Sequence, residues 1–211
     1  MYTIGKRSRP FISLIMKFDY EQINHLISAR RSIFPKGYVQ GKTVDDQIIN
    51  QILENANWAP THKLTEPWRF VVFSGEGLKK LGDFQATCYK EVATRLGDFK
   101  EERYQNLLIQ PMQFSHVIAV GMKRDKEKRI REIEEVGAVF CAIQNMYLTA
   151  TAYGVGCYLS TGGITYFEEA KSFFGWKEED KLIGFFNLGV IDTELKPGKR
   201  KPIGEKVEWI R

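Results

Sequence analysis

The sequence predicts an α+β protein whose central sheet is covered by helices. Short runs rich in β-branched and aromatic residues alternate with longer runs whose apolar residues follow a helical period. One helix-length segment is apolar on nearly every face, as in helices enclosed by a core or by a second subunit. The 211 residues are 43% hydrophobic and 27% charged, which is typical of folded globular chains. These observations place strands and helices around one core.

The first half of the chain is mainly helical, with one strand. The elements predicted there are helix Tyr20–Ala29, helix Asp45–Trp58, strand Trp68–Gly75, and helical sequence from Leu78 to about Leu108 with a break near Gly97. Pro60 ends the second helix, because proline disfavours helical backbone in the residue before it.

The second half supplies the other strands. In order, it predicts strand His116–Lys123, helix Val136–Tyr153, strand Gly156–Ser160, a short helix within Thr165–Gly175, and strand Leu182–Val190. No linker divides these elements, so residues 18–211 are assigned to a single domain. Residues 1–17 are set apart as an N-terminal extension, with Met16 as an alternative start.

The helix Val136–Tyr153 is apolar on nearly every face but contains two side-chain amides, which argue against a membrane span. We predict a central helix that is buried partly by a partner chain. Its small residues Gly137, Ala138 and Ala142 are expected to let another helix approach closely.

The formal net charge of +5 is concentrated in two basic runs, Lys123–Arg131 and Lys196–Lys201. The first run is interleaved with acidic residues and is expected to be a solvated loop or helix face. The second suits an anionic small molecule, phosphate in particular. Neither run is accompanied by a nucleic-acid-binding signature, so no nucleic-acid partner is predicted.

The three cysteines lack C-x-x-C spacing and are odd in number, which argues against a disulfide framework and a zinc site. A reduced, cytoplasmic protein is expected. Cys141 and Cys157 lie in apolar sequence and are predicted to be unreactive. His25 is expected at the surface and His116 at a strand start, so no metal site is predicted.

Three small polar clusters remain as candidate binding residues. They are Arg30–Ser32 after the first helix, His62–Lys63 in the loop before the first strand, and Lys199–Lys201 near the C-terminus. Guanidinium groups and a hydroxyl suit a phosphate and the polar edge of a heterocycle. Phosphate-loop, Rossmann, nucleophile-elbow and zinc-protease motifs do not occur.

The order of these motifs resembles a known family. RRS ends the first helix, A-P-x6-P-W-x-F precedes the first strand, GVGCYLSTGG follows the apolar helix, and KRKP lies near the end. The chain from Phe18 to Arg211 is similar in this way to the FMN-dependent nitroreductases, in particular to a short-chain branch whose loop reads AP-x-HK. The resemblance implies a nitroreductase-like fold, with a mostly antiparallel sheet and a long buried helix at the interface of an obligate homodimer.

The resemblance also implies two FMN sites at that interface, each built from both chains. The implied FMN-binding residues are Arg30, Arg31, Ser32, Pro60, Thr61, His62, Leu159, Ser160, Thr161, Gly162, Gly163, Lys199 and Arg200, with Lys63 at the substrate or flavin edge. Of these, Pro60, Thr61 and His62 are expected to come from the other subunit. Leu64, Glu66 and Phe34 depart from the family pattern, so no partner of flavin N1 is assigned.

The implied activity is NAD(P)H-dependent reduction of a nitroaromatic, a quinone or a similar small acceptor by ping-pong hydride transfer through flavin N5. No side chain is assigned as catalytic. Acceptor choice is expected to lie in the region from about Leu78 to Gln113. Two alternatives stay open: another flavin reaction on the same fold, and a non-redox basic dimeric protein that binds an anionic ligand or nucleic acid.

Overall fold

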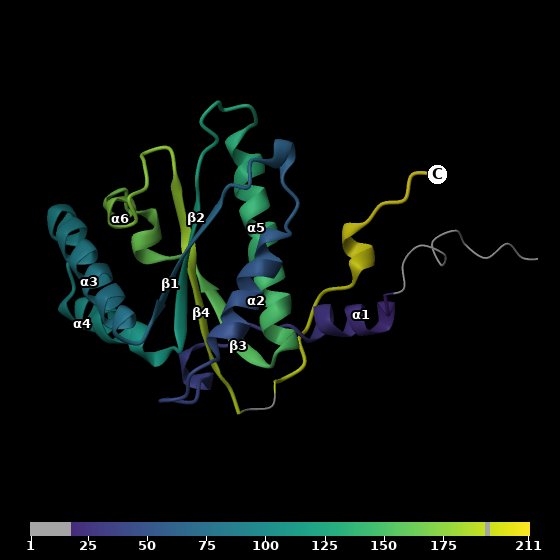
Figure 1. The fold of residues 1–211 in the computed structure, drawn as a ribbon, viewed down its shortest axis with the longest axis horizontal. Helices are drawn as coiled ribbons and strands as arrows, with labels where there is room; N and C mark the ends of the chain where they lie inside the picture. Colours follow the sequence, from purple (N-terminus) through teal and green to yellow (C-terminus); the bar gives the residue numbers. More distant parts are fainter. Residues whose placement is uncertain (1–17, 193–194) are drawn as a thin grey trace, which may run out of the picture.

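A four-stranded sheet stands between two layers of helices in the computed structural model, which describes residues 18–192 and 195–211 (Figure 1). One face carries α2 (Asp46–Asn57) and α5 (Glu132–Ala152), and the other carries α3 (Glu76–Leu96), α4 (Glu101–Ile109) and α6 (Glu169–Phe173). The predicted α+β class is confirmed. The predicted extension 1–17 lies outside the described residues.

The sheet is antiparallel throughout. Its strands are β1 (Trp68–Ser74), β2 (His116–Met122), β3 (Val155–Ser160) and β4 (Lys181–Val190), in the order β1-β2-β4-β3. This order makes β2 and β4 central, and every residue of β2 is buried. A strand covered on both faces reads as a continuous apolar run, which is how the sequence identified it.

Each face of the sheet has its own core. Ile118 and Val120 of β2 face α2 and α5, whereas Val117 and Ala119 face the α3 side. Because side chains alternate along a strand, the neighbours of Phe186 on β4 point to the opposite face from its own ring. Burial on both faces therefore fixes the register of the sheet.

Local signals account for most element boundaries. Gly97 ends α3 in the left-handed conformation, with φ +72°, which confirms the predicted break. Helix α5 begins at Glu132, four residues before the predicted start, because acidic residues in its first turn favour a helix N-terminus. Helix α6 is shorter than predicted, since Gly163–Tyr166 forms a separate 3-10 turn.

Two of the three small residues of α5 let another helix of the same chain approach closely. Ala138 and Ala142 are buried within their own chain, in the core shared with α2, and only Gly137 is exposed. The amide of Asn145 also faces inward, and its Nδ2 donates to the backbone oxygen of Asn55 at 2.9 Å. Small side chains on α5 thus permit the close approach of α2.

The opposite side of α5 is open in the single chain. Phe140 is about half exposed there, and so is Tyr153 at the C-cap of the helix. Cys141 is exposed as well, which corrects the apolar setting predicted for it. Cys157 is buried in β3 as predicted, and burial raises the pKa of its thiol to about 12.

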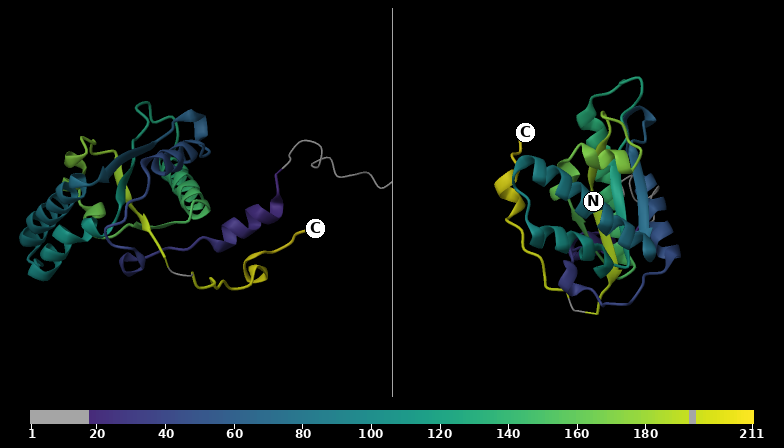
Figure 2. Two further views of the ribbon diagram at one scale, coloured as in Figure 1. Left: turned by 60° about the horizontal axis from the view of Figure 1, so that its bottom comes forward. Right: turned by 90° about the vertical axis from the view of Figure 1, so that its left-hand side faces the viewer.

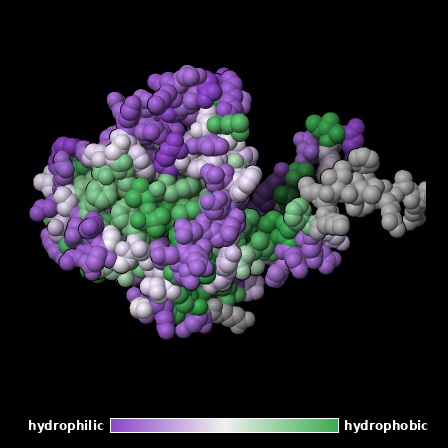
Figure 3. Space-filling model, in the orientation of Figure 1, coloured by the Kyte–Doolittle hydropathy of each residue, from purple (hydrophilic) through white to green (hydrophobic). Residues whose placement is uncertain are grey.

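Helix α1 (Tyr20–Ala29) and the C-terminal segment 195–211 extend away from the body on the same side (Figures 1 and 2). Helix α1 has no buried residue. The exposed apolar side chains of the two segments are Phe18, Tyr20, Ile23, Ile27, Leu195, Ile203, Val207, Trp209 and Ile210. Figure 3 shows apolar side chains on the surface of α1 and on the body beside it. Within the described ranges, no helix is long and apolar enough to cross a membrane.

The basic run Lys123–Arg131 is a loop, as predicted, but it is tied to α5. The guanidinium of Arg124 pairs with the carboxylate of Glu135, which is wholly buried, and donates to the backbone oxygen of Ile130 at 2.7 Å. Glu135 also accepts the N–H of Asp125 at 2.9 Å. The guanidinium of Arg129 binds Asp125 and lowers the pKa of that carboxyl to about 2.

Replacing Glu135 with alanine is expected to lower the free energy of unfolding by about 3–5 kcal/mol, because a buried guanidinium loses its partner. Urea denaturation monitored by circular dichroism measures this change. The matched control is the double variant Arg124→Met/Glu135→Leu, which removes both charges and is expected to cost about 1–2 kcal/mol. If Glu135→Ala is as stable as the double variant, the assignment of a buried ion pair is contradicted.

Candidate functional site

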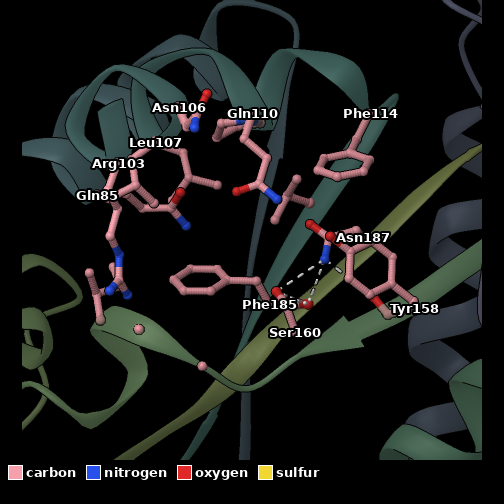
Figure 4. A pocket seen from close by; sticks show the side chains of 16 residues that line it. Gln85, Arg103, Asn106, Leu107, Gln110, Phe114, Tyr158, Ser160, Phe185 and Asn187 are labelled. Atoms are coloured by element: carbon pink, nitrogen blue, oxygen red, sulfur yellow. Dashed lines mark hydrogen bonds between the residues drawn. The ribbon is translucent and has the colours of Figure 1, made fainter. Parts of the chain in front are cut away.

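The candidate site is a cavity of ≈ 270 Å³ between the sheet and helices α3 and α4 (Figure 4). One wall is formed by strands β3 and β4 and the turn after β3, and the other by side chains of α3, α4 and the 3-10 turn Gln110–Gln113. The polar side chains that line the cavity are Gln85, Arg103, Asn106, Gln110, Tyr158, Ser160 and Asn187. None of the lining residues is a carboxylate.

Asn187 organises the strand wall. It lies opposite Tyr158 in the register of β3 and β4 and is 3% exposed. Its Nδ2 donates to the backbone oxygens of Phe185 at 3.0 Å and Tyr158 at 3.3 Å, and to Oγ of Ser160 at 3.2 Å (Figure 4). One amide therefore holds the end of β3 against β4, and the floor of the cavity is rigid.

The helix wall presents amides and one cation. Arg103 and Asn106 lie one turn apart on α4, and Gln110 follows one turn later, so these side chains share one face. The guanidinium carbon of Arg103 lies 4.8 Å from the centre of the Tyr89 ring. Amides both donate and accept hydrogen bonds, which suits a heterocycle with alternating N–H and C=O groups.

A glycine turn closes the cavity at the end of β3. Gly163 has φ +66°, and a Cβ there would lie 3.2 Å from Nη2 of Arg103. The hydroxyl of Thr165 donates to the backbone oxygen of Thr161 at 2.7 Å, and the oxygen of Gly162 lies at 3.3 Å. Glycine leaves the backbone of the turn accessible to a ligand, and the hydrogen bonds of the Thr165 hydroxyl hold its conformation.

Aromatic side chains make the remaining surface. The Tyr158 ring lies between Phe34 and Phe114, with centroid distances of 5.4 and 5.9 Å. Burial raises the pKa of the Tyr158 phenol. A neutral phenol between two apolar rings keeps this side of the cavity suited to a planar, uncharged group.

The structure brings part of the predicted site together. Ser160, Gly162 and Gly163 line the cavity, with Leu159 and Thr161 beside them in the chain. The segment Arg30–Ser32 approaches the edge of β3, because the N–H of the next residue, Ile33, donates to the backbone oxygen of Cys157 at 2.9 Å.

The two arginines of that segment have separate contacts. Arg30 places its guanidinium carbon 5.1 Å from the centre of the Tyr147 ring. Arg31 donates from Nε to the backbone oxygen of Lys196 at 3.1 Å, which holds the C-terminal basic run near the first helix. In that run, Lys199 and Arg200 are exposed.

The loop before β1 lies elsewhere. His62 Nδ1 is 2.5 Å from Oε2 of Glu134 in the first turn of α5, and Nζ of Lys63 donates to the backbone oxygen of Arg129 at 3.2 Å. Pro60 is exposed and Thr61 half-buried. The backbone beyond is strained: Lys63, Leu64 and Glu66 all have φ between 43° and 52°.

Helix α5 separates this loop from the segment Arg30–Ser32. His62 contacts Glu134 near the start of the helix, whereas Arg30 contacts Tyr147 near its end. At the rise of an α-helix these two contacts are about 20 Å apart. Within one chain, therefore, the structure does not bring Pro60, Thr61, His62 and Lys63 to the residues that approach β3.

The histidines do not form a metal site. His116 starts β2, where its Nδ1 lies 2.8 Å from Oγ of Ser115 and its Nε2 lies 3.0 Å from Oδ1 of Asp46. His25 is exposed on α1. No group of three or more His, Cys, Asp or Glu side chains suited to a metal ion occurs among the described residues.

The chain is thus an α+β protein with an amide-lined cavity at the end of an edge strand. The sequence profile of the Nitroreductase family matches residues 27–190, which is most of the chain. The chain belongs to the Nitroreductase family.

Individual relatives agree with this assignment. The chain is 30% identical over 190 residues to "Putative NAD(P)H nitroreductase YfhC" of Bacillus subtilis (strain 168), covering 89% of this chain and 94% of that one. A nitroreductase-like family protein from Bacillus cereus has a TM-score of 0.76 and 29% identity, over 92% of this chain and 99% of that chain.

A third structure shares the fold at lower identity. The FMN-dependent nitroreductase NfnB from Mycobacterium smegmatis, solved in complex with NADPH, has a TM-score of 0.69 and 17% identity. The match covers 92% of this chain and 100% of NfnB.

Changing Asn187 to aspartate is expected to destabilise the fold by about 2–3 kcal/mol at pH 7, because an acceptor-only carboxylate replaces a buried donor that faces backbone oxygens. Those oxygens raise the pKa of the introduced carboxyl above its value in the unfolded chain. The loss of free energy of unfolding that comes from this ionisation is therefore absent below about pH 4 and grows as the pH rises.

Thermal unfolding between pH 4 and pH 8 measures this dependence. Asn57→Asp is the matched control, since Oδ1 of Asn57 accepts a hydrogen bond from Trp68 Nε1 at 2.9 Å and a carboxylate can also accept it. Equal pH profiles for the two variants contradict a donor role for Asn187.

Proposed function

We propose that this protein is an FMN-dependent oxidoreductase that uses NADH or NADPH to reduce a small acceptor such as a nitroaromatic or a quinone. The observation that carries the proposal is the cavity at the end of β3, where the amides of α4 and its following turn face the backbone of Ser160–Gly163. Family membership and the fold shared with an FMN-dependent nitroreductase support it.

The residues present fit the isoalloxazine ring and the phosphate of FMN. Asn106 and Gln110 match the imide edge, whose carbonyls accept and whose N–H donates. The turn Ser160–Gly163 offers backbone N–H groups to the central ring. Arg31, which holds the Lys196–Lys201 run near Ser32, brings basic groups together for a phosphate.

Bound FMN would supply the two-electron chemistry between NAD(P)H and the acceptor. The chain's own residues orient the ring, exclude water and set the local charge. Phe114 and Phe185 supply apolar walls, and the phenol of Tyr158 stays neutral. Among the described residues, Arg103 is the one cation that lines the cavity, and its charge would favour electron-rich states of a bound ring.

We further propose a homodimer in which each site takes residues from both chains. The loop Pro60–Lys63 lies about 20 Å along α5 from the segment Arg30–Ser32, too far to share one small ligand. A second copy with its loop beside the first copy's β3 would bring the two together. The exposed apolar residues of α1, the C-terminal segment and the open side of α5 would then be covered.

The purified protein is expected to show the two visible and near-ultraviolet absorption bands of a flavin, and both should bleach under nitrogen when NADPH or NADH is added. Reoxidation by a nitroaromatic or a quinone then ranks the acceptors. Two results together contradict this function: the protein does not take up added FMN, and it binds DNA in a salt-dependent way. They favour a basic binding protein instead.

The two-chain site is tested with Arg200→Ala and His62→Ala, which change exposed side chains. Each homodimeric variant is expected to retain little FMN. A mixed dimer, made by co-expression with two affinity tags, is expected to regain one FMN per dimer, because one of its sites keeps both residues. Mixed dimers as poor in FMN as the parents contradict a site shared between chains.

A further inference from the structure

The hydroxyl of Tyr147 accepts the N–H of Leu159 at 2.6 Å. Tyr147 lies on α5, near its C-terminal end, and Leu159 lies near the end of β3. The Tyr147 ring packs edge-on against Phe186, which is fully buried, with a centroid distance of 4.9 Å. Core packing therefore fixes the ring, and the ring fixes the position of its hydroxyl.

This hydrogen bond occupies a place where the sheet has no further strand. Strand β3 pairs with β4 on one side, and its other edge receives the backbone N–H of Ile33 at Cys157. Two residues further along, the N–H of Leu159 points to a side chain instead. The Tyr147 hydroxyl thus replaces the backbone acceptor that a neighbouring strand would supply, just before the turn that lines the cavity.

The same ring contacts the first basic cluster. The guanidinium carbon of Arg30 lies 5.1 Å from the ring centre, a cation–π distance. Tyr147 is therefore in contact with two parts of the proposed FMN site, the Arg30–Ser32 segment and the strand end. A phenylalanine there would keep the ring contacts and lose only the hydrogen bond.

We propose that Tyr147 is a positioning residue for the flavin, acting through the backbone of Leu159 to hold the segment Leu159–Gly163 in the form that faces the ring. The proposal rests on the proposed function, since it concerns bound FMN. Its physical basis is the cost of an unpaired N–H: the strand end without its acceptor can shift, and the N–H donors that follow shift with it.

The test compares Tyr147→Phe with Tyr153→Phe, a control at the C-cap of the same helix, where the tyrosine is about half exposed. In the protein without FMN, amide exchange of Leu159 is expected to be about tenfold faster in Tyr147→Phe and unchanged in the control. The dissociation constant of FMN is expected to rise about tenfold, as for the loss of one hydrogen bond of about 1.4 kcal/mol.

The midpoint potential of bound FMN separates positioning from plain stability. It is expected to fall in Tyr147→Phe, because donors that favour the reduced ring are held less well, and to stay unchanged in Tyr153→Phe. If the wild type binds FMN and Tyr147→Phe matches its affinity and potential, the role of Tyr147 is overturned while the proposed function stands. If the wild type binds no FMN, both are overturned, whatever the exchange of Leu159 shows.

Discussion

An edge strand leaves backbone N–H and C=O groups without a neighbour, and in this protein the open edge of β3 is where the site forms. Two contacts cover part of that edge, and a turn follows it. Ile33 pairs with Cys157 through the backbone, Tyr147 accepts the N–H of Leu159, and the glycine turn after Ser160 leaves its own backbone uncovered. Two backbone groups of this edge therefore have partners, and the cavity opens at its end.

Burial on both faces of the sheet makes this arrangement possible. Strand β3 is held by β4, and Asn187 fastens the two ends by donating to both strands. Behind them, α5 packs on α2 through Ala138 and Ala142, which brings Tyr147 within reach of β3. Ala138 and Ala142, which were predicted to let another helix approach closely, do so for α2 within the subunit. The exposed side of α5 carries the larger residue Phe140, which suits an interface of a different kind.

Much of the fold could be predicted because its signals are local. The apolar run of β2 and the glycine at the end of α3 specify their elements whatever their neighbours are. The strand end at Ser160–Gly163 was predicted from its motif, and Ser160, Gly162 and Gly163 line the cavity. Arg103, Asn106 and Gln110 were missed, because polar residues one turn apart also describe an ordinary solvated helix face. Only the placement of α4 over the end of β3 shows that these side chains line a cavity.

Charge gives the cavity its chemical character. Family members that place a basic residue two positions after the RRS serine have a cation where this chain has Phe34, whose ring instead packs on Tyr158. The amide of Gln110 and the guanidinium of Arg103 lie on the opposite wall, so positive charge enters from the variable helices rather than from the first motif. A single cation among amides stabilises added negative charge on a ring without holding a second anion tightly. In the proposed function, this balance would favour the reduced flavin and still let a charged product leave, so that one site could serve reductant and acceptor in turn.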